Sequence, residues 1–145
     1  MSVFSKTCEY ALRAVFYIAK QTESGRKVGI KDIAQGIESP ELYLGKILQD
    51  LSRKGLIGSA KGPNGGFFLT KEMLALPLIE VVRAVDGDNL FTGCGLGLKF
   101  CSAVNPCPLH DQFLAIRTGI VDMLTGTSIG SFNKELIDGF LSLKK

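Results

Sequence analysis

The first half of the chain places apolar residues at the three- and four-residue spacing of helices that bury one face. This pattern predicts three helices: one in the opening segment, one in KDIAQGI, and one from Ser39 to Lys54. Their expected buried positions are Tyr10, Ala11, Ala14, Val15, Ile18 and Ala19; then Ile30, Ile33, Ala34 and Ile37; then Leu44, Ile47, Leu48 and Leu51.

The third predicted helix has clear signals at both ends. We expect Ser39 to be its N-cap, Pro40 its first helical residue, and Glu41 to lie in the electropositive first turn. Gly55 follows the helix, where a left-handed residue commonly ends it.

Two short strand-like runs, LIGSA and FFLT, follow this helix and are joined by KGPNGG. Three helices followed by a two-stranded hairpin is the order of a winged helix-turn-helix, whose third helix enters the DNA major groove. The fold class is therefore predicted as mainly α with a small β-hairpin wing. An alternative for the hairpin is that its glycines and asparagine only form a tight turn. The candidate DNA-binding residues are Ser39, Pro40, Glu41, Tyr43, Lys46, Lys61, Gly62, Asn64 and Gly65.

A further amphipathic stripe runs through residues 108–124, and we expect it to form a long C-terminal dimerisation helix. The wing half has its own predicted core, which leaves this stripe without an expected partner in the same chain. The alternative is that it packs on its own domain. The stripe comprises Leu109, Phe113, Ile116, Ile120 and Leu124.

Composition fits one globular domain of 145 residues, with 46% apolar and 21% charged residues. Residues 1–72 carry eleven Lys or Arg against seven Asp or Glu, and residues 73–145 carry six against seven. A mildly basic first half permits nucleic-acid binding without establishing it. No apolar run approaches the roughly 18 residues of a membrane span, and the N-terminus lacks a signal-peptide pattern. We therefore expect a cytoplasmic protein with no membrane partner.

Three of the four cysteines and the only histidine fall within CGLGLKFCSAVNPCPLH, residues 94–110. Cys94, Cys101 and Cys107 are separated by six and five residues, and thiolates suit iron–sulfur clusters, Cu(I) or zinc. Zinc sites usually contain a close Cys-x₂₋₄-Cys pair, so the wide spacing favours a cluster, with structural zinc as the alternative. Cys8 lies in the first helix and is expected to be a small buried residue.

The run LQDLSRKGLIGSAKGPNGGFFLTK resembles the helix-and-wing signature of the IscR/NsrR-type family of bacterial winged-helix transcription regulators. SKTCEYALRAVFYIA resembles its first helix, LPLIEVVRAVDG its following helix, and CPLHDQFLAIRTGIVDMLTGTSIG its dimerisation helix. The resemblance covers nearly the whole chain. It implies a homodimer that binds double-stranded DNA at a roughly palindromic operator.

The resemblance also implies a ligand set. Cluster-bearing members bind iron through three loop cysteines, at positions matched here by Cys94, Cys101 and Cys107. The fourth ligand is the histidine of a CPLH-like end, which is His110, or a carboxylate from the partner's first helix, which maps to Glu9. We favour His110, because only two residues separate it from Cys107; Cys8 is a weaker third candidate.

These observations predict a dimeric transcription regulator, not an enzyme, that senses iron, redox state or nitric oxide through a 2Fe–2S or 4Fe–4S cluster. The chain lacks a CxxC redox pair and has a single histidine, which leaves little for thiol-redox or triad chemistry. The alternative is a winged-helix regulator with structural zinc, or no metal, that senses a small metabolite. The predicted division is 1–85 for DNA binding, 86–107 for the cluster-binding loop, and 108–145 for the dimerisation and C-terminal helices.

Overall fold

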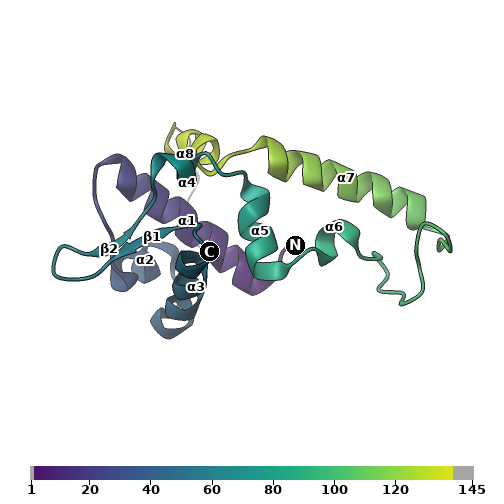
Figure 1. Cartoon of the computed structure of the whole chain (residues 1–145), viewed down its shortest axis with the longest axis horizontal. Coiled ribbons are helices and arrows are strands. Elements are labelled where there is room, and N and C mark those ends of the chain that lie inside the picture. Colours follow the sequence, from purple (N-terminus) through teal and green to yellow (C-terminus); the bar gives the residue numbers. More distant parts are fainter. Residues whose placement is uncertain (1, 139–145) are drawn as a thin grey trace.

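The computed structural model describes residues 2–138, so the last seven residues of the predicted 108–145 segment lie outside the described part. It is mainly helical with one two-stranded antiparallel sheet, which confirms the predicted fold class (Figure 1). The elements in chain order are α1 (Lys6–Glu23), α2 (Ile30–Ile37), α3 (Glu41–Arg53), β1 (Gly58–Ala60), β2 (Gly66–Phe68), α4 (Lys71–Leu74), α5 (Leu78–Asp86), α6 (Asn89–Thr92), α7 (His110–Gly126) and α8 (Ile129–Asp138).

The core lies among α1, α2, α3 and α5, where the predicted apolar stripes meet. All six predicted stripe residues of α1 are buried, as are the four of α3. In α2 the stripe is buried except for Ile30, which is half-buried at the first helical position. Cys8 is fully buried in this core, as expected for a small apolar side chain.

The turn between α2 and α3 differs from the predicted one. Pro40 has an extended backbone (φ −61°, ψ 133°), so the helix begins at Glu41 and the N-cap position falls on Pro40. Ser39 does not cap α3: its N–H closes the end of α2 on the carbonyl of Ala34 (2.9 Å), and its hydroxyl donates to the carbonyl of Pro40 (3.2 Å). The predicted start was wrong by one residue because Ser39 belongs to the end of the preceding helix.

The other end of α3 is as predicted. Gly55 adopts a left-handed conformation (φ 78°), and its N–H bonds to the carbonyl of Ser52 (3.1 Å). The N–H of Leu56 bonds to the carbonyl of Leu51 (3.0 Å), which completes the paired pattern of a glycine-terminated helix. The chain then turns directly into the wing, residues 58–68, with Gly58 opposite Phe68 and Ala60 opposite Gly66.

Helix α7 runs along the molecule away from the wing and the helices α1 to α3, and the cysteine loop, residues 93–109, joins its far end to α6 (Figure 1). Helix α8 returns to pack on α1 and α4. Ile129 is fully buried there, and the rings of Phe132 and Phe16 stack with centroids 4.1 Å apart. The C-terminal helix therefore contributes to the core of the first half, although it follows α7 in the chain.

Candidate functional site

The cysteine loop brings its three sulfur atoms together. The Sγ atoms of Cys94, Cys101 and Cys107 all lie within 4.8 Å of one another, and all three residues are half-buried. They are free thiols in the structure. Residues seven and six positions apart meet because the loop folds back on itself before α7. The three loop cysteines predicted as metal ligands therefore form one group.

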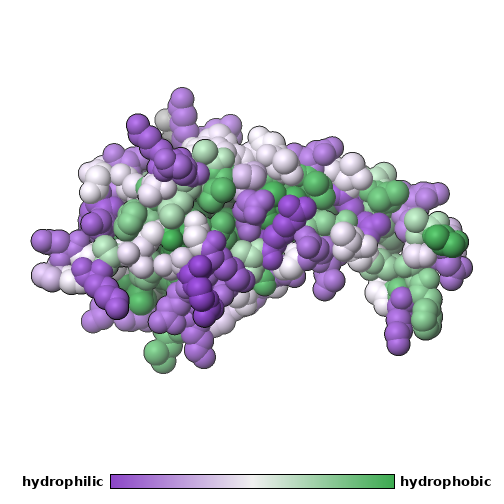
Figure 2. Space-filling model, viewed as in Figure 1, coloured by the Kyte–Doolittle hydropathy of each residue, from purple (hydrophilic) through white to green (hydrophobic). Residues whose placement is uncertain are grey.

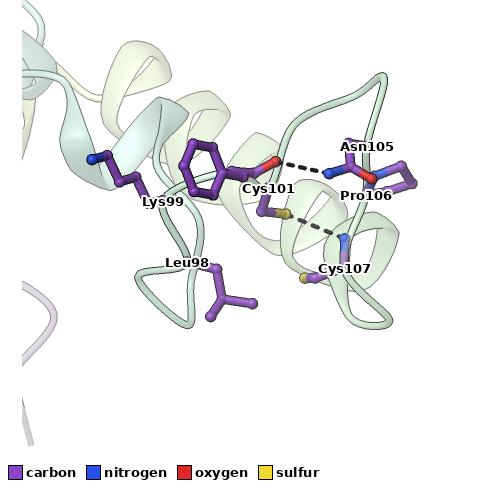
Figure 3. Close-up of a pocket in the computed structure, with 7 residues that line it drawn as sticks. Leu98, Lys99, Cys101, Asn105, Pro106 and Cys107 are labelled. Atoms are coloured by element: carbon purple, nitrogen blue, oxygen red, sulfur yellow. Dashed lines mark hydrogen bonds between the residues drawn. The ribbon is translucent and has the colours of Figure 1, made fainter.

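Backbone and side-chain hydrogen bonds fix the fold of this loop. The N–H of Cys107 donates to Cys101 Sγ (3.3 Å), and the amide of Asn105 donates to the carbonyl of Phe100 (3.3 Å; Figure 3). The N–H of Asn105 donates to the hydroxyl of Ser102 (3.1 Å), whose own N–H bonds to the carbonyl of Asn105 (3.1 Å). A turn held in this way presents Cys101 and Cys107 on one side.

The surroundings of Cys94 and Cys101 shift the pKa values of their thiols in opposite directions. The backbone N–H groups of Leu98 and Leu96 point at the Cys94 sulfur and lower the pKa of its thiol. The N–H of Cys107 acts in the same sense on Cys101, but partial desolvation and the neighbouring thiols of Cys107 and Cys94 outweigh it and raise the pKa of Cys101. Cys94 is therefore the thiol that ionises more readily, and the thiolate is the form that binds metal.

His110 lies beside this group as the first residue of α7. Its Nδ1 atom is 3.5 Å from Cys101 Sγ, and its N–H bonds to the carbonyl of Cys107 (3.0 Å). The sequence favoured His110 as a ligand because it is close to Cys107 along the chain. The contact with Cys101 instead follows from the folded loop, which brings residue 101 back over the start of the helix.

The other two candidate ligands lie elsewhere in the chain. Glu9 is half-buried in the first turn of α1, and in the described residues the metal-ligand group consists of the three loop cysteines alone. Burial, with Asp86 and Glu9 nearby, raises the pKa of the Cys8 thiol to about 12. Cys8 is thus an inert core thiol, while Glu9 stays a candidate only through a partner subunit.

The loop residues fit a bound metal group in their chemistry. Three thiols converge, a ring nitrogen is adjacent, and backbone N–H groups point at two of the sulfurs. Two thiolates on one tetrahedral zinc lie about 3.8 Å apart, given a Zn–S bond of about 2.3 Å. Sulfurs within 4.8 Å of one another are thus closer to the spacing of ligands on a single metal ion, whereas a cluster with several irons needs the loop to widen.

The expected DNA-binding residues lie on α3 and the wing. Glu41, Lys46, Lys61, Gly62 and Asn64 are exposed, as is Pro40, while Ser39 is half-buried. Gly62 is left-handed (φ 98°), as a tight turn requires. A Cβ on Gly65 would lie 2.2 Å from the carbonyl oxygen of Ala60, so the hairpin itself requires that glycine.

Tyr43 lies against α1. Its ring meets that of Tyr10 edge-on, with centroids 5.4 Å apart and planes at 77°, and its hydroxyl hydrogen-bonds to Thr7. The side chain is 36% exposed. Tyr43 was among the predicted DNA-binding residues, whereas its neighbour Leu42, which is 89% exposed, was not. The signal was available: Leu42 is an apolar residue on the outward face of α3.

The predicted dimerisation stripe lies on one face of α7, buried along one edge and exposed along the other. Leu124 is 3% exposed and belongs to the core, Ile120 packs on that core, and Phe113 lies against Gly95 of the loop. The expectation that the stripe lacks a partner in its own chain was wrong for these three. Leu109 and Ile116 are exposed, at 39% and 60%.

A three-helix core with a glycine-rich wing and a cysteine loop on a protruding helix defines a winged-helix regulator. The family model "Rrf2: Iron-dependent Transcriptional regulator" matches residues 4–135, and the chain belongs to this family. It is a family of transcription regulators, which bind DNA, and not of enzymes.

Two similar proteins are also named as transcriptional regulators. A protein of Aquifex aeolicus named as an HTH-type transcriptional regulator is 33% identical over 138 residues, covering 94% of this chain and 92% of that protein. The HTH-type transcriptional regulator IscR of Klebsiella pneumoniae is 28% identical, covering 89% and 79%.

Solved structures share the fold. CymR, the global cysteine regulator of B. subtilis, superposes with a TM-score of 0.77 at 22% identity, covering 93% of this chain and 98% of that chain. T. potens IscR superposes with a TM-score of 0.73 at 22% identity, covering 95% and 90%. Within residues 2–138, no helix is both long and apolar enough to span a membrane.

Proposed function

We propose that this chain is a dimeric, cytoplasmic regulator whose affinity for operator DNA depends on an iron–sulfur cluster in the cysteine loop. The observation that carries the proposal is the convergence of three loop thiols beside His110 in a member of an iron-dependent regulator family. Cys94, Cys101 and Cys107 would hold the group, with His110 as the fourth ligand. The cluster would supply a site that gains or loses iron, is oxidised, or reacts with nitric oxide.

The position of the loop supports coupling between the state of the cluster and the affinity for DNA. The loop connects α6, which follows the DNA-binding half, to the start of α7. If the cluster binds one conformation of this loop more tightly, its binding shifts the population of the protein toward that conformation. The affinity for DNA then changes by the same factor by which DNA changes the affinity for the cluster. α3 would enter the major groove, and Lys61 at the wing tip would contact a phosphate.

An exposed side of α7 supports the dimer. Leu109, Ile116 and Met123 follow one another at seven-residue intervals and are 39%, 60% and 57% exposed. Gly119, one turn before Met123, is exposed beside this line and has no side chain, which leaves room for a second helix. We infer that two copies pair here and present their α3 helices to the half-sites of a palindromic operator.

A mononuclear zinc site is the second candidate, favoured by the compact sulfur group, whose spacing is closer to that of ligands on one ion. In this alternative the metal stabilises the loop and the regulator senses a small metabolite. The solved structure of CymR, named a cysteine regulator, shares the fold.

Anaerobic purification followed by visible absorption and metal analysis separates the two candidates. A brown protein with visible charge-transfer bands and bound iron and sulfide is expected. A colourless protein with one zinc per chain would establish the alternative. Operator binding by the loaded and chelated forms then tests the link: equal affinities would exclude control by the metal group.

A further inference from the structure

The outward face of α3 carries a single large apolar side chain. Leu42 lies opposite the buried positions of the helix, in line with Lys46 and Gln49, which are also exposed. At 89% exposure it covers almost nothing in its own chain. Figure 2 shows hydrophobic atoms projecting beneath α3 among hydrophilic ones. Packing within the chain therefore does not explain this leucine.

The neighbouring aromatic side chain does not share this position. Tyr43 is held against α1 by its edge-on contact with Tyr10 and its hydrogen bond to Thr7. Leu42, unlike Tyr43, is therefore an apolar side chain of the first turn of α3 that is not packed on the protein's own surface. The first turn of a recognition helix is the part that reaches base edges.

A glycine one turn later supports close approach of another molecule to this face. Gly45 lies inside the helix, where glycine is less favourable than alanine. Its φ is not positive, and an added Cβ would meet only Ile30 Cδ1, at an ordinary 3.9 Å. Neither backbone conformation nor crowding thus requires a glycine. Its missing side chain leaves the surface beside Leu42 open to a close neighbour.

We propose that Leu42 contacts the C5-methyl group of a thymine in the major groove and thereby sets part of the operator sequence. Among base edges in that groove, the thymine methyl is the apolar feature that a leucine can recognise. Lys46, one turn further along the same face, would contact the backbone and position the helix without selecting a base. The proposal rests on the placement of α3 in the major groove.

The test begins with selection of binding sites from random duplexes by the full-length protein, in its anaerobically loaded and chelated forms. Each thymine of the selected site is then replaced by deoxyuridine, which removes only the methyl group. Binding is measured for the wild type, for Leu42→Ala, and for Val104→Ala as a control. Val104 is an equally exposed apolar residue (96%) in the cysteine loop.

The wild type is expected to lose about threefold to fivefold affinity per half-site at one symmetric thymine pair, the effect of one buried methyl group. Leu42→Ala should lose a similar factor on the thymine duplex and be insensitive to deoxyuridine there, while Val104→Ala should behave as the wild type. A deoxyuridine effect of equal size in Leu42→Ala and wild type would overturn the contact and leave the regulator assignment intact. Failure of the wild type to select any sequence would overturn both.

Gly45→Ala tests the close approach separately. The substitution fits the chain, so the melting temperature should be unchanged or raised. Affinity for the selected duplex should fall more than affinity for a scrambled one. Equal losses on the two duplexes would overturn the close approach on which the thymine contact depends.

Discussion

The guanidinium of Arg117 donates a hydrogen bond to the carbonyl oxygen of Gly93, the residue before Cys94. One turn earlier on α7, the ring of Phe113 lies against Gly95, the residue after Cys94. A Cβ added to Gly95 would lie 2.5 Å from that ring. Helix α7 therefore holds both neighbours of the first loop cysteine. The geometry of the sulfur group is thus tied to the helix on which we place the dimer interface.

Arg117→Ala should loosen the loop around Cys94. Loss of the charged donor leaves the Gly93 carbonyl without that partner and should lower the free energy of unfolding by about 1–2 kcal/mol. The loaded protein should also release its metal to a chelator several-fold faster. Chemical denaturation and chelator-release kinetics measure the two effects.

Arg26→Ala is the matched control, because Arg26 is an exposed arginine paired with Asp32 (3.1 Å) far from the loop. Arg26→Ala should change the free energy of unfolding by less than about 1 kcal/mol and leave the rate of metal release unaltered. Equal release rates in the wild type and Arg117→Ala would show that α7 does not hold the first ligand.

Dimerisation should depend on one side of α7. Ile116→Glu places a charge on the exposed line of Leu109, Ile116 and Met123 and should convert the dimer to a monomer at micromolar concentration. Leu114→Glu is the control, since Leu114 is also exposed (47%) but lies on the other side of the helix. Sedimentation equilibrium measures whether each variant is a monomer or a dimer. Dissociation by Leu114→Glu with an intact Ile116→Glu dimer would place the interface on the opposite side.

Hydrophobic periodicity identified the buried residues of α3 but not those of α7. Helix α3 has one buried stripe and mostly polar or charged residues elsewhere, Leu42 excepted, so its inward residues could be named from the sequence. Helix α7 carries apolar residues on several sides, and its hydrophobic positions serve both the core, as Leu124 does, and the exposed line that contains Ile116. Spacing alone could not divide them, because both sets follow the same helical repeat.

The metal-ligand group was predictable as a set but not in its geometry. Three cysteines with wide gaps indicated convergence, whereas the contact between His110 and Cys101 depends on how the intervening loop folds back. Hydrogen bonds such as that from Asn105 to the Phe100 carbonyl decide that path. Ser39 was misplaced for a similar reason, since its N–H completes the preceding helix instead of capping α3.

Lys61 at the wing tip should contribute to DNA affinity without contributing to sequence preference. Lys61→Ala should weaken binding to all duplexes alike and reduce the slope of log K against log salt by about 0.9 per subunit. Lys99→Ala is the control, because Lys99 is an exposed lysine of the cysteine loop. Titrations at several salt concentrations give both slopes. An unchanged slope in Lys61→Ala would remove the wing from the interface.

Stability should fall at alkaline pH through Cys8. Burial raises the pKa of its thiol from 9.0 to about 12, so the thiolate forms in the unfolded chain at lower pH than in the folded one. The contribution of Cys8 is fully present below about pH 9 and is lost between about pH 9 and 12. The difference in unfolding free energy between the wild type and Cys8→Ala should shrink there by up to about 1.4 kcal/mol per pH unit. A difference that is constant over this range in metal-free protein would contradict the assignment of a buried thiol.

The fourth ligand can be decided by paired substitutions, since the two candidates make different demands on the molecule. His110 needs only a small movement, because Nδ1 already lies 3.5 Å from a ligand sulfur of the same chain. Glu9 needs a second subunit to bring α1 of the partner to the loop. We expect His110→Ala, reconstituted anaerobically, to keep a labile cluster with shifted absorption, and Glu9→Ala to match the wild type. Cys101→Ala should lose the cluster, which calibrates the assay. A shifted spectrum in Glu9→Ala with an unchanged one in His110→Ala would assign the ligand to the partner and connect the cluster directly to the helix that supports Tyr43 and α3.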